Sequence, residues 1–125
     1  MSGITFDAGG LIALDRGDRR ALALLARATE RDMRITIPAT ALAQAMRNPS
    51  KQARLSRLIR QATTDLIALD GPDATAVGLL LAKTGTADIA DAHVVLCALR
   101  AGQAVLTSDP HDLRRIDPGL TLVSV

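Results

Sequence analysis

The fold is decided by residues 87–113, ADIADAHVVLCALRAGQAVLTSDPHDL, where the sequence changes from helical to strand-like and back. Helical spacing of the apolar side chains predicts a helix over 88–100, closed by Gly102, a residue type that commonly follows a helix end. A short apolar run predicts a strand over 104–107. The Asp-Pro pair that follows predicts a helix over 110–116, because proline fits the first helical turn. A helix, a strand and a helix in this order are typical of a parallel sheet covered by helices.

The rest of the chain continues this alternation. Strands are predicted over 3–6, 34–37, 65–69 and 120–125. One helix is predicted to start at Leu11, and a second to follow the cap Asp18. Three more are predicted over 38–47, over 50–61 with Ser50 as its cap, and over 72–83. We therefore expect an α/β fold in which helices cover both faces of a mostly parallel sheet of about five strands, a three-layer α/β/α sandwich. Residues 1–125 contain no repeat or linker, so a single domain is expected.

The composition is that of a globular protein from a reducing compartment. Hydrophobic residues make up 48% of the chain and charged residues 22%, a balance that excludes a disordered protein. No apolar run approaches the length of a membrane span, the N-terminus lacks the pattern of a secretory signal, and a single cysteine, Cys97, suits the cytosol. We expect a cytoplasmic protein with no membrane contact. With one Phe and no Trp or Tyr, the chain also lacks aromatic platforms for stacking bases.

The two halves of the chain carry opposite charge. Residues 1–60 hold 11 basic and 5 acidic side chains, whereas 61–125 hold 4 basic and 8 acidic, so the net charge of +2 hides values of +6 and −4. Between residues 33 and 64 there is no carboxylate, and the basic side chains there are Arg34, Arg47, Lys51, Arg54, Arg57 and Arg60. A segregated basic stretch suggests a polyanion partner, although a solvated helix face would have the same composition.

Three carboxylates are placed where the predicted elements meet one edge of the sheet. Asp7 follows the strand over 3–6, Asp109 follows the strand over 104–107, and Asp91 lies in the first turn of the helix before that strand. In an open α/β sheet ligands bind at the carboxyl ends of the strands, so these three residues should share a crevice. A divalent cation compensates crowded carboxylates, and oxygen ligands favour Mg²⁺ or Mn²⁺. Such a site suits hydrolysis of a phosphodiester by metal-activated water.

Helix capping is the competing structural role for these side chains. Asp88 and Asp109 each precede a predicted helix, where an aspartate commonly accepts a hydrogen bond from the first turn. Asp112 lies in a first helical turn, where a carboxylate favours the helix dipole. Capping is less favourable at Asp7, because the glycines at positions 9 and 10 make a poor helix start.

Four segments together resemble the PIN-domain ribonucleases, in particular the VapC-type toxins of bacterial toxin–antitoxin operons. They are ITFDAGGLIAL at 4–14, IPATALAQAMR at 37–47, ADIADAHVVLCA at 87–98 and VLTSDPHDL at 105–113, and they span nearly the whole chain in the family's order. The resemblance implies a PIN-like fold and a metal site built from Asp7, Asp91 and Asp109. A position where the family usually has Glu falls on Gln44, so we expect Asp88 to supply the missing charge. A supporting role is assigned to Gln44, Ser108 and Asp112.

The same resemblance implies a metal-dependent endoribonuclease that acts as a toxin. Mg²⁺ or Mn²⁺ would be held by Asp7, Asp91, Asp109 and Asp88. The RNA backbone would be bound by Arg47, Lys51, Arg54, Arg57 and Arg60. The resemblance further implies a homodimer and a small VapB-like antitoxin as partner, for which the basic helix over 50–61 is an alternative docking site.

Other classes of protein stay open at this point. The neutral Gln44 is compatible with a PIN-like module that binds RNA or protein without efficient cleavage. A response-regulator domain also has an acidic crevice, but it needs a lysine after a late strand, and both lysines lie elsewhere. A phosphatase with an Asp-x-Asp motif is disfavoured, because the residue two positions after Asp7 is glycine. His93 and His111 are weaker candidates for a general base.

Overall fold

The computed structural model describes residues 3–125, which form five strands, seven α-helices and one 3₁₀ turn. In chain order they are β1 (Gly3–Phe6), α1 (Ala8–Asp15), α2 (Arg19–Glu30), β2 (Arg34–Pro38), α3 (Ala39–Ala45), the 3₁₀ turn η1 (Pro49–Lys51), α4 (Ala53–Ile59), β3 (Thr64–Ile67), α5 (Gly71–Thr84), α6 (Ile89–Ala101), β4 (Ala104–Thr107), α7 (Pro110–Ile116) and β5 (Leu122–Ser124). Strands and helices alternate as the sequence predicts. None of the helices within this part of the chain is long and apolar enough to cross a bilayer.

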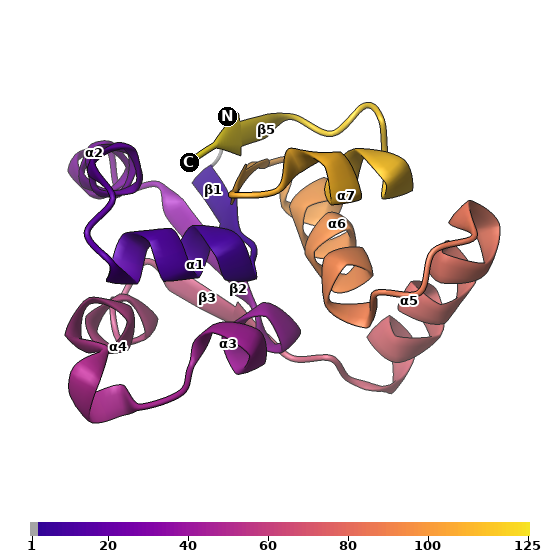
Figure 1. Ribbon diagram of the computed structural model, residues 1–125, viewed down its shortest axis with the longest axis horizontal. Coiled ribbons are helices and arrows are strands. Elements are labelled where there is room, and N and C mark those ends of the chain that lie inside the picture. The colour runs from indigo at the N-terminus through magenta and orange to yellow at the C-terminus, as the bar shows by residue number, and fades with distance from the viewer. Residues whose placement is uncertain (1–2) are drawn as a thin grey trace.

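The sheet is parallel throughout, in the order β3-β2-β1-β4-β5. β1 lies at its centre, with Ile4 opposite Ile35 of β2 on one side and opposite Ala104 of β4 on the other. All four residues of β1 are buried, as expected for a central parallel strand with helices on both faces. The predicted α/β architecture with about five parallel strands is therefore confirmed (Figure 1).

Helices form a layer on each side of the sheet. Figure 1 shows α1, α2 and α4 on one side and α5, α6 and α7 on the other, with α3 in contact with α1 and α6. The core between the layers is built from aliphatic side chains and one aromatic ring, that of Phe6. Its largest fully buried members include Leu11, Leu14, Ile35, Ile37, Leu55, Leu58, Leu106 and Leu113.

The start of α1 differs from the sequence prediction. The helix begins directly after Asp7, which is its N-cap and accepts a hydrogen bond at Oδ1 from the Gly10 N–H over 2.7 Å. The prediction that Gly9 and Gly10 precede the helix is therefore wrong. A Cβ on Gly9 would overlap the Ser108 side chain, and one on Gly10 would overlap the carbonyl oxygen of Leu106. Glycine is required because α1 crosses the end of β4 at close range, and this contact outweighs the low helix propensity of glycine.

Other boundaries also differ. Ser50 does not cap α4; instead Asn48 accepts hydrogen bonds from the Ser50 N–H (3.2 Å) and hydroxyl (2.7 Å) and opens η1. α4 begins only after Gln52. The side-chain Oε1 of Gln52 accepts a hydrogen bond from the backbone N–H of Arg47 over 2.7 Å. Pro38 ends β2 rather than lying within α3, and β3 and β5 are shorter than the predicted runs, because the apolar sequence continues beyond the paired residues.

Gly10→Ala tests the close contact between α1 and β4. We expect it to lower the free energy of unfolding by about 2 kcal/mol, the usual range for forcing an extra methyl group into a packed core. The matched control is Gly78→Ala in the middle of α5, where a Cβ would meet nothing within 4 Å. This control should raise stability by up to about 1 kcal/mol, since alanine is the better helix former. Urea unfolding measures both, and equal effects would contradict the proposed contact.

Candidate active site

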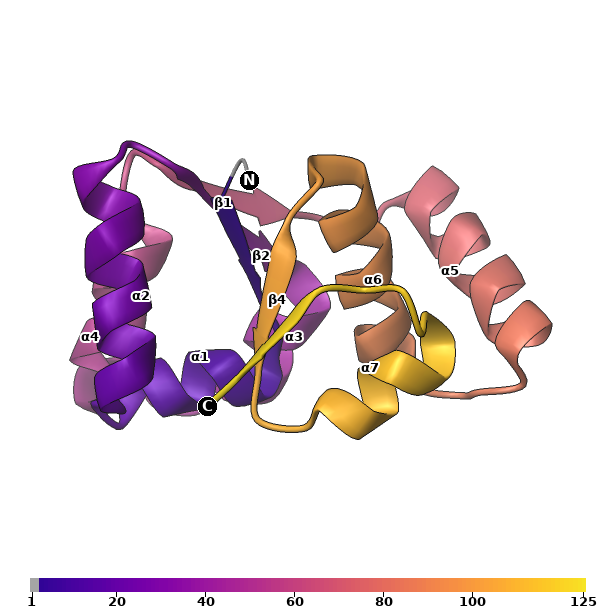
Figure 2. The same ribbon diagram turned by 90° about the horizontal axis from the view of Figure 1, so that it is seen from above.

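The centre of the site lies at the carboxyl ends of β1 and β4. The path of the chain across the sheet changes direction at this pair, since β2 and β3 lie on one side and β5 on the other. Open α/β sheets bind ligands at such a switch point. Asp7 directly follows β1 and Asp109 follows β4 by two residues. Figure 2 shows these strands running to one edge beside α1, so the two predicted aspartates lie at the same edge.

Asp7 is held firmly and is nearly buried. Its side chain caps α1 through Gly10, and its exposed fraction is 7%. Burial raises the pKa of Asp7 above its ordinary value of 3.8, and the charge of Asp109 raises it further. Hydrogen bonds from the Thr107 side chain and from the amides at positions 10 and 9 act in the opposite direction. Asp7 therefore has a fixed orientation and a charged neighbour of the same sign.

Asp109 occupies the N-cap position of α7 without capping it. Its side chain makes no hydrogen bond to the first turn of the helix, so the capping role considered for it is wrong. Its backbone N–H donates to Thr107 Oγ1 over 3.0 Å, which turns the chain sharply after β4. Ser108 packs against Gly9 in this turn. The Asp109 carboxylate stays exposed and available at the edge of the sheet.

Asp91 is surrounded by the other acidic residues of the site. Asp88 caps α6, accepting a hydrogen bond at Oδ1 from the Asp91 N–H over 2.9 Å, as its position in the sequence predicts. The pKa of Asp91 is raised from 3.8 to about 6, first by burial and then by the charges of Asp88, Asp112, Asp7 and Asp109. We call these five carboxylates the acidic cluster. Because the other four charges all act on Asp91, the structure brings the four predicted metal ligands near one another, together with the predicted supporting residue Asp112.

The acidic cluster is not a ready-made metal cage. Within residues 3–125 no group of three or more His, Cys, Asp or Glu side chains is arranged to hold a metal ion by itself. Mg²⁺ seldom uses such cages, because it retains several waters and binds one or two carboxylates together with a substrate phosphate. The oxygen-only donor set and the uncompensated charge around Asp91 therefore fit this cation.

Asp88 lies between two surface depressions. One, of about 400 Å³, is lined by Gln44 and Thr40 of α3 and by Asp88 at the start of α6. The other, of about 340 Å³, is lined by Asp88, Asp91 and the α7 residues Asp112 and Arg115. The structure thus places Gln44 beside Asp88, on the side of Asp88 away from α7.

The sequence interpretation missed Arg115. The residue is exposed and lines the same depression as three members of the acidic cluster. Its spacing of three residues from Asp112 places both on one helix face, which was the available signal.

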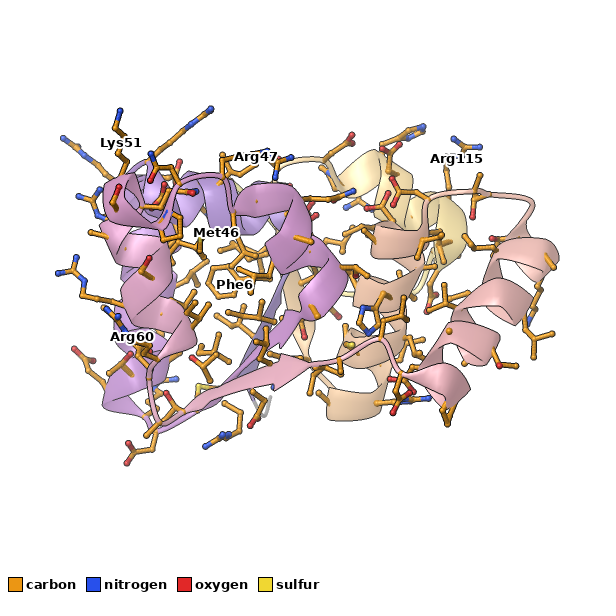
Figure 3. The ribbon with its side chains drawn as sticks, turned by 90° about the horizontal axis from the view of Figure 1, so that it is seen from below. Phe6, Met46, Arg47, Lys51, Arg60 and Arg115 are labelled. Carbon is orange, nitrogen blue, oxygen red and sulfur yellow. The ribbon has the colours of Figure 1, made fainter. Side chains whose placement is uncertain are left out.

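The predicted RNA-binding residues are all exposed, but they do not share one face. Figure 3 shows Arg47 and Lys51 at the edge that also carries Arg115, whereas Arg60 lies toward the opposite edge. Arg54 and Arg57 line a groove of about 150 Å³ between the helices, together with Leu14, Leu22 and Leu25. The placement of Arg47 and Lys51 suits contact with a substrate at the acidic cluster.

His93 does not join the site as a base. His93 is buried in the core, with Nδ1 2.7 Å from the Thr40 hydroxyl, and burial lowers its pKa. His111 is exposed in the first turn of α7. Cys97 is buried, and burial raises the pKa of its thiol to about 11, which indicates packing rather than reactivity.

The strand order and the two helical layers give the α/β fold that the sequence predicts, and comparison with solved structures agrees. VapBC2 from Rickettsia felis, bound to a DNA fragment from its promoter, matches with a TM-score of 0.70 at 16% identity over 98% of both chains. FitAcB from Neisseria gonorrhoeae matches with a TM-score of 0.63 at 17% identity over 97% of this chain and 96% of that one. PAE2754 from Pyrobaculum aerophilum gives 0.65 at 17% identity, over 97% and 83%.

These likenesses establish the fold rather than the activity, because the identities are low. No protein-family model and no curated protein matches the sequence. Activity, metal and substrate therefore have to be argued from the site itself.

Asp91→Asn tests the electrostatic strain in metal-free protein. Because the folded-state pKa of Asp91 (about 6) exceeds 3.8, the folded protein binds this proton more tightly than the unfolded chain. The contribution of Asp91 to wild-type stability therefore falls as the pH rises from about 4 to 6 and then levels off. We expect Asp91→Asn to gain stability relative to wild type over this interval, as measured by urea unfolding at several pH values.

The matched control is Asp32→Asn, which removes an exposed carboxylate remote from the acidic cluster. Asp32 has a φ of 50°, a conformation that asparagine also tolerates. Its stability difference from wild type should stay nearly constant between about pH 4.5 and 7. A constant difference for Asp91→Asn as well would refute the crowding of charge at this residue.

Proposed function

We propose that this protein is a metal-dependent endoribonuclease that acts as the toxin of a toxin–antitoxin pair. The observation that carries the proposal is the gathering of Asp7, Asp91 and Asp109 at the switch point of the sheet, where their charges have no cationic partner within ion-pair distance. The ion pairs formed within residues 3–125, Arg34–Asp65 and Arg100–Asp73, lie outside this cluster. Uncompensated carboxylates at a ligand-binding edge favour a cation and, through it, a phosphate substrate.

Mg²⁺ or Mn²⁺ is the cofactor that these residues fit. Asp7, Asp91 and Asp109 would hold it, and Asp88 would add the charge that Gln44 lacks. When bound, such an ion activates a water for attack on a phosphodiester and neutralises charge on the phosphate. The chain's own contribution is orientation: the Gly10 amide and the Thr107 side chain fix the carboxylate of Asp7, and the turn after Thr107 directs Asp109 to the same edge.

An antitoxin partner is supported by the structural neighbours, among which VapBC2 of Rickettsia felis is described as bound to a DNA fragment from its promoter. On this chain the groove of Leu14, Leu22 and Leu25, flanked by Arg54 and Arg57, offers apolar and cationic contacts to a small VapB-like protein. A neighbouring gene for such a protein, and relief of growth inhibition when both are expressed together, would support this partner. Unrelieved inhibition by the neighbouring gene product would argue against it.

A homodimer is the further assembly we propose. Four large apolar side chains are exposed, Leu66, Leu79, Ile89 and Leu99, with exposed fractions of 49% to 68%. They belong to β3, α5 and α6, away from the apolar groove described above. Light scattering after gel filtration distinguishes a dimer from a monomer, and a monomer at all concentrations would refute this assembly.

Asp7→Asn is the direct test of nuclease activity. We expect wild-type protein to cleave structured RNA with Mg²⁺ or Mn²⁺, and the variant to be slower by at least about 100-fold, since a metal ligand contributes several kcal/mol of charge stabilisation. Asparagine caps a helix as well as aspartate does, so α1 should keep its start. Gel analysis of end-labelled RNA measures the rates.

Asp32→Asn serves as the matched control, because it removes a carboxylate far from the site and should cleave at the wild-type rate. Equal rates for wild type and Asp7→Asn would show that the acidic cluster is not the catalytic centre. RNA binding by wild type without cleavage would favour the binding module instead.

Gln44→Glu tests whether α3 contributes to the metal site. Because Gln44 faces the depression that Asp88 lines, a carboxylate there should strengthen Mn²⁺ binding by about 10-fold, the scale of outer-shell effects on metal affinity. Calorimetric titration with Mn²⁺ measures this change, with Gln44→Ala as the control for loss of the side chain. Identical affinities in wild type and both variants would remove Gln44 from the site.

A further inference from the structure

Arg115 is a cation at the rim of the acidic cluster. It lies near the end of α7 and lines the depression of about 340 Å³ that also contains Asp88, Asp91 and Asp112. Its side chain is exposed, and Figure 3 shows it at the edge that carries Arg47 and Lys51. An arginine is thus present at a place where all its ionisable neighbours in the depression are acidic.

Arg115 nevertheless forms no ion pair. Asp112 lies three residues earlier on the same helix face, yet the ion pairs within 4.0 Å in the described part of the chain are Arg34–Asp65 and Arg100–Asp73. The guanidinium is therefore not committed to neutralising a carboxylate. It retains its donors for a ligand that enters the depression.

The two depressions adjoin each other, because they share lining residues. Asp88 borders the α3 depression with Gln44 on one side and the Arg115 depression on the other. Arg47 follows α3 closely in sequence, and its guanidinium bonds the carbonyls of Ala43 and Met46 at the end of that helix. Figure 3 shows Arg47 and Lys51 on the same edge of the molecule as Arg115, so this edge carries cations from the segment between α3 and α4 and from α7.

We propose that Arg115 binds a backbone phosphate of the RNA on the α7 side of the acidic cluster, opposite Arg47 and Lys51. This rests on the proposed ribonuclease function and adds a direction to it: the strand crosses the cluster from α3 to α7. Guanidinium is suited to the task, because its planar donors bind phosphate oxygens in pairs. A cation beside the cluster also offsets the repulsion that five carboxylates exert on an incoming polyanion.

The test measures RNA binding rather than cleavage. Fluorescence anisotropy of a fluorescein-labelled single-stranded RNA of mixed sequence is recorded in EDTA over a range of NaCl concentrations. We expect Arg115→Gln to bind about 5-fold more weakly than wild type, and the slope of log affinity against log salt to become shallower by about 0.7, the value for one lost phosphate contact on a single strand. Arg115→Lys should keep the wild-type slope.

The matched control is Arg114→Gln, an exposed arginine on the same helix that does not line the depression. It should keep the wild-type slope. Slopes and affinities that agree between Arg115→Gln and Arg114→Gln would overturn the proposal, as would absence of RNA binding by wild type. A lower melting temperature of Arg115→Gln with unchanged RNA binding would assign the residue to charge balance in the fold and would overturn it too.

Failure of this inference and failure of the nuclease proposal are separable. If wild type does not cleave RNA but Arg115→Gln still weakens binding with the shallower slope, Arg115 is an RNA contact and the nuclease proposal falls. If wild type cleaves and Arg115→Gln binds as wild type does, the nuclease proposal stands and the role of Arg115 is refuted.

Discussion

Close contact between α1 and the end of β4 is the constraint on which the site depends. Two glycines let the first turn of α1 lie directly against the Leu106 carbonyl and the Ser108 side chain. The same turn supplies the amide that fixes Asp7, and the parallel pairing of β1 with β4 sets Thr107 one residue beyond the partner of Phe6. Backbone packing, rather than any bond between the carboxylates, therefore brings the acidic residues to one edge.

The acidic cluster is maintained against electrostatic cost. Elsewhere the protein pairs its partly buried charge: Asp73, which is nearly inaccessible, is bonded to Arg100 over 2.6 Å. Within residues 3–125 the cluster has no such ion pair, and burial together with the neighbouring carboxylates raises the pKa of Asp91. Proteins commonly give up stability at functional sites, where a ligand later compensates the strain. The fold tolerates this electrostatic cost because its buried aliphatic core supplies stability.

Much of this arrangement follows from local rules in the sequence. Periodicity and the Asp-Pro and Gly signals predict the alternating elements, and the position of Asp7 and Asp109 after strands predicts their shared edge. The start of α1 is not predictable in this way, because its glycines are required by close contact with a strand about a hundred residues away in the sequence. The Ser50 cap is wrong because the N–H and the hydroxyl of Ser50 both donate to Asn48, which opens η1 ahead of α4. The place of Arg115 in the site is not predictable from the sequence, because its acidic neighbours come mostly from α6. The basic run over 47–60 does not form one surface, since its residues divide between an edge of the molecule and an apolar groove.

The central position of β1 has a consequence for how the protein is made. Thr5 of β1 bonds Gln103, 98 residues later, and β1 cannot complete its pairing until β4 exists. Contacts of such long sequence separation slow folding, and domains emerging from the ribosome fold as units. A nascent chain therefore carries Asp7 long before Asp109 can join it. The acidic edge can be assembled only after β4 and Asp109 have been synthesised, so chains that stop before them lack a complete site.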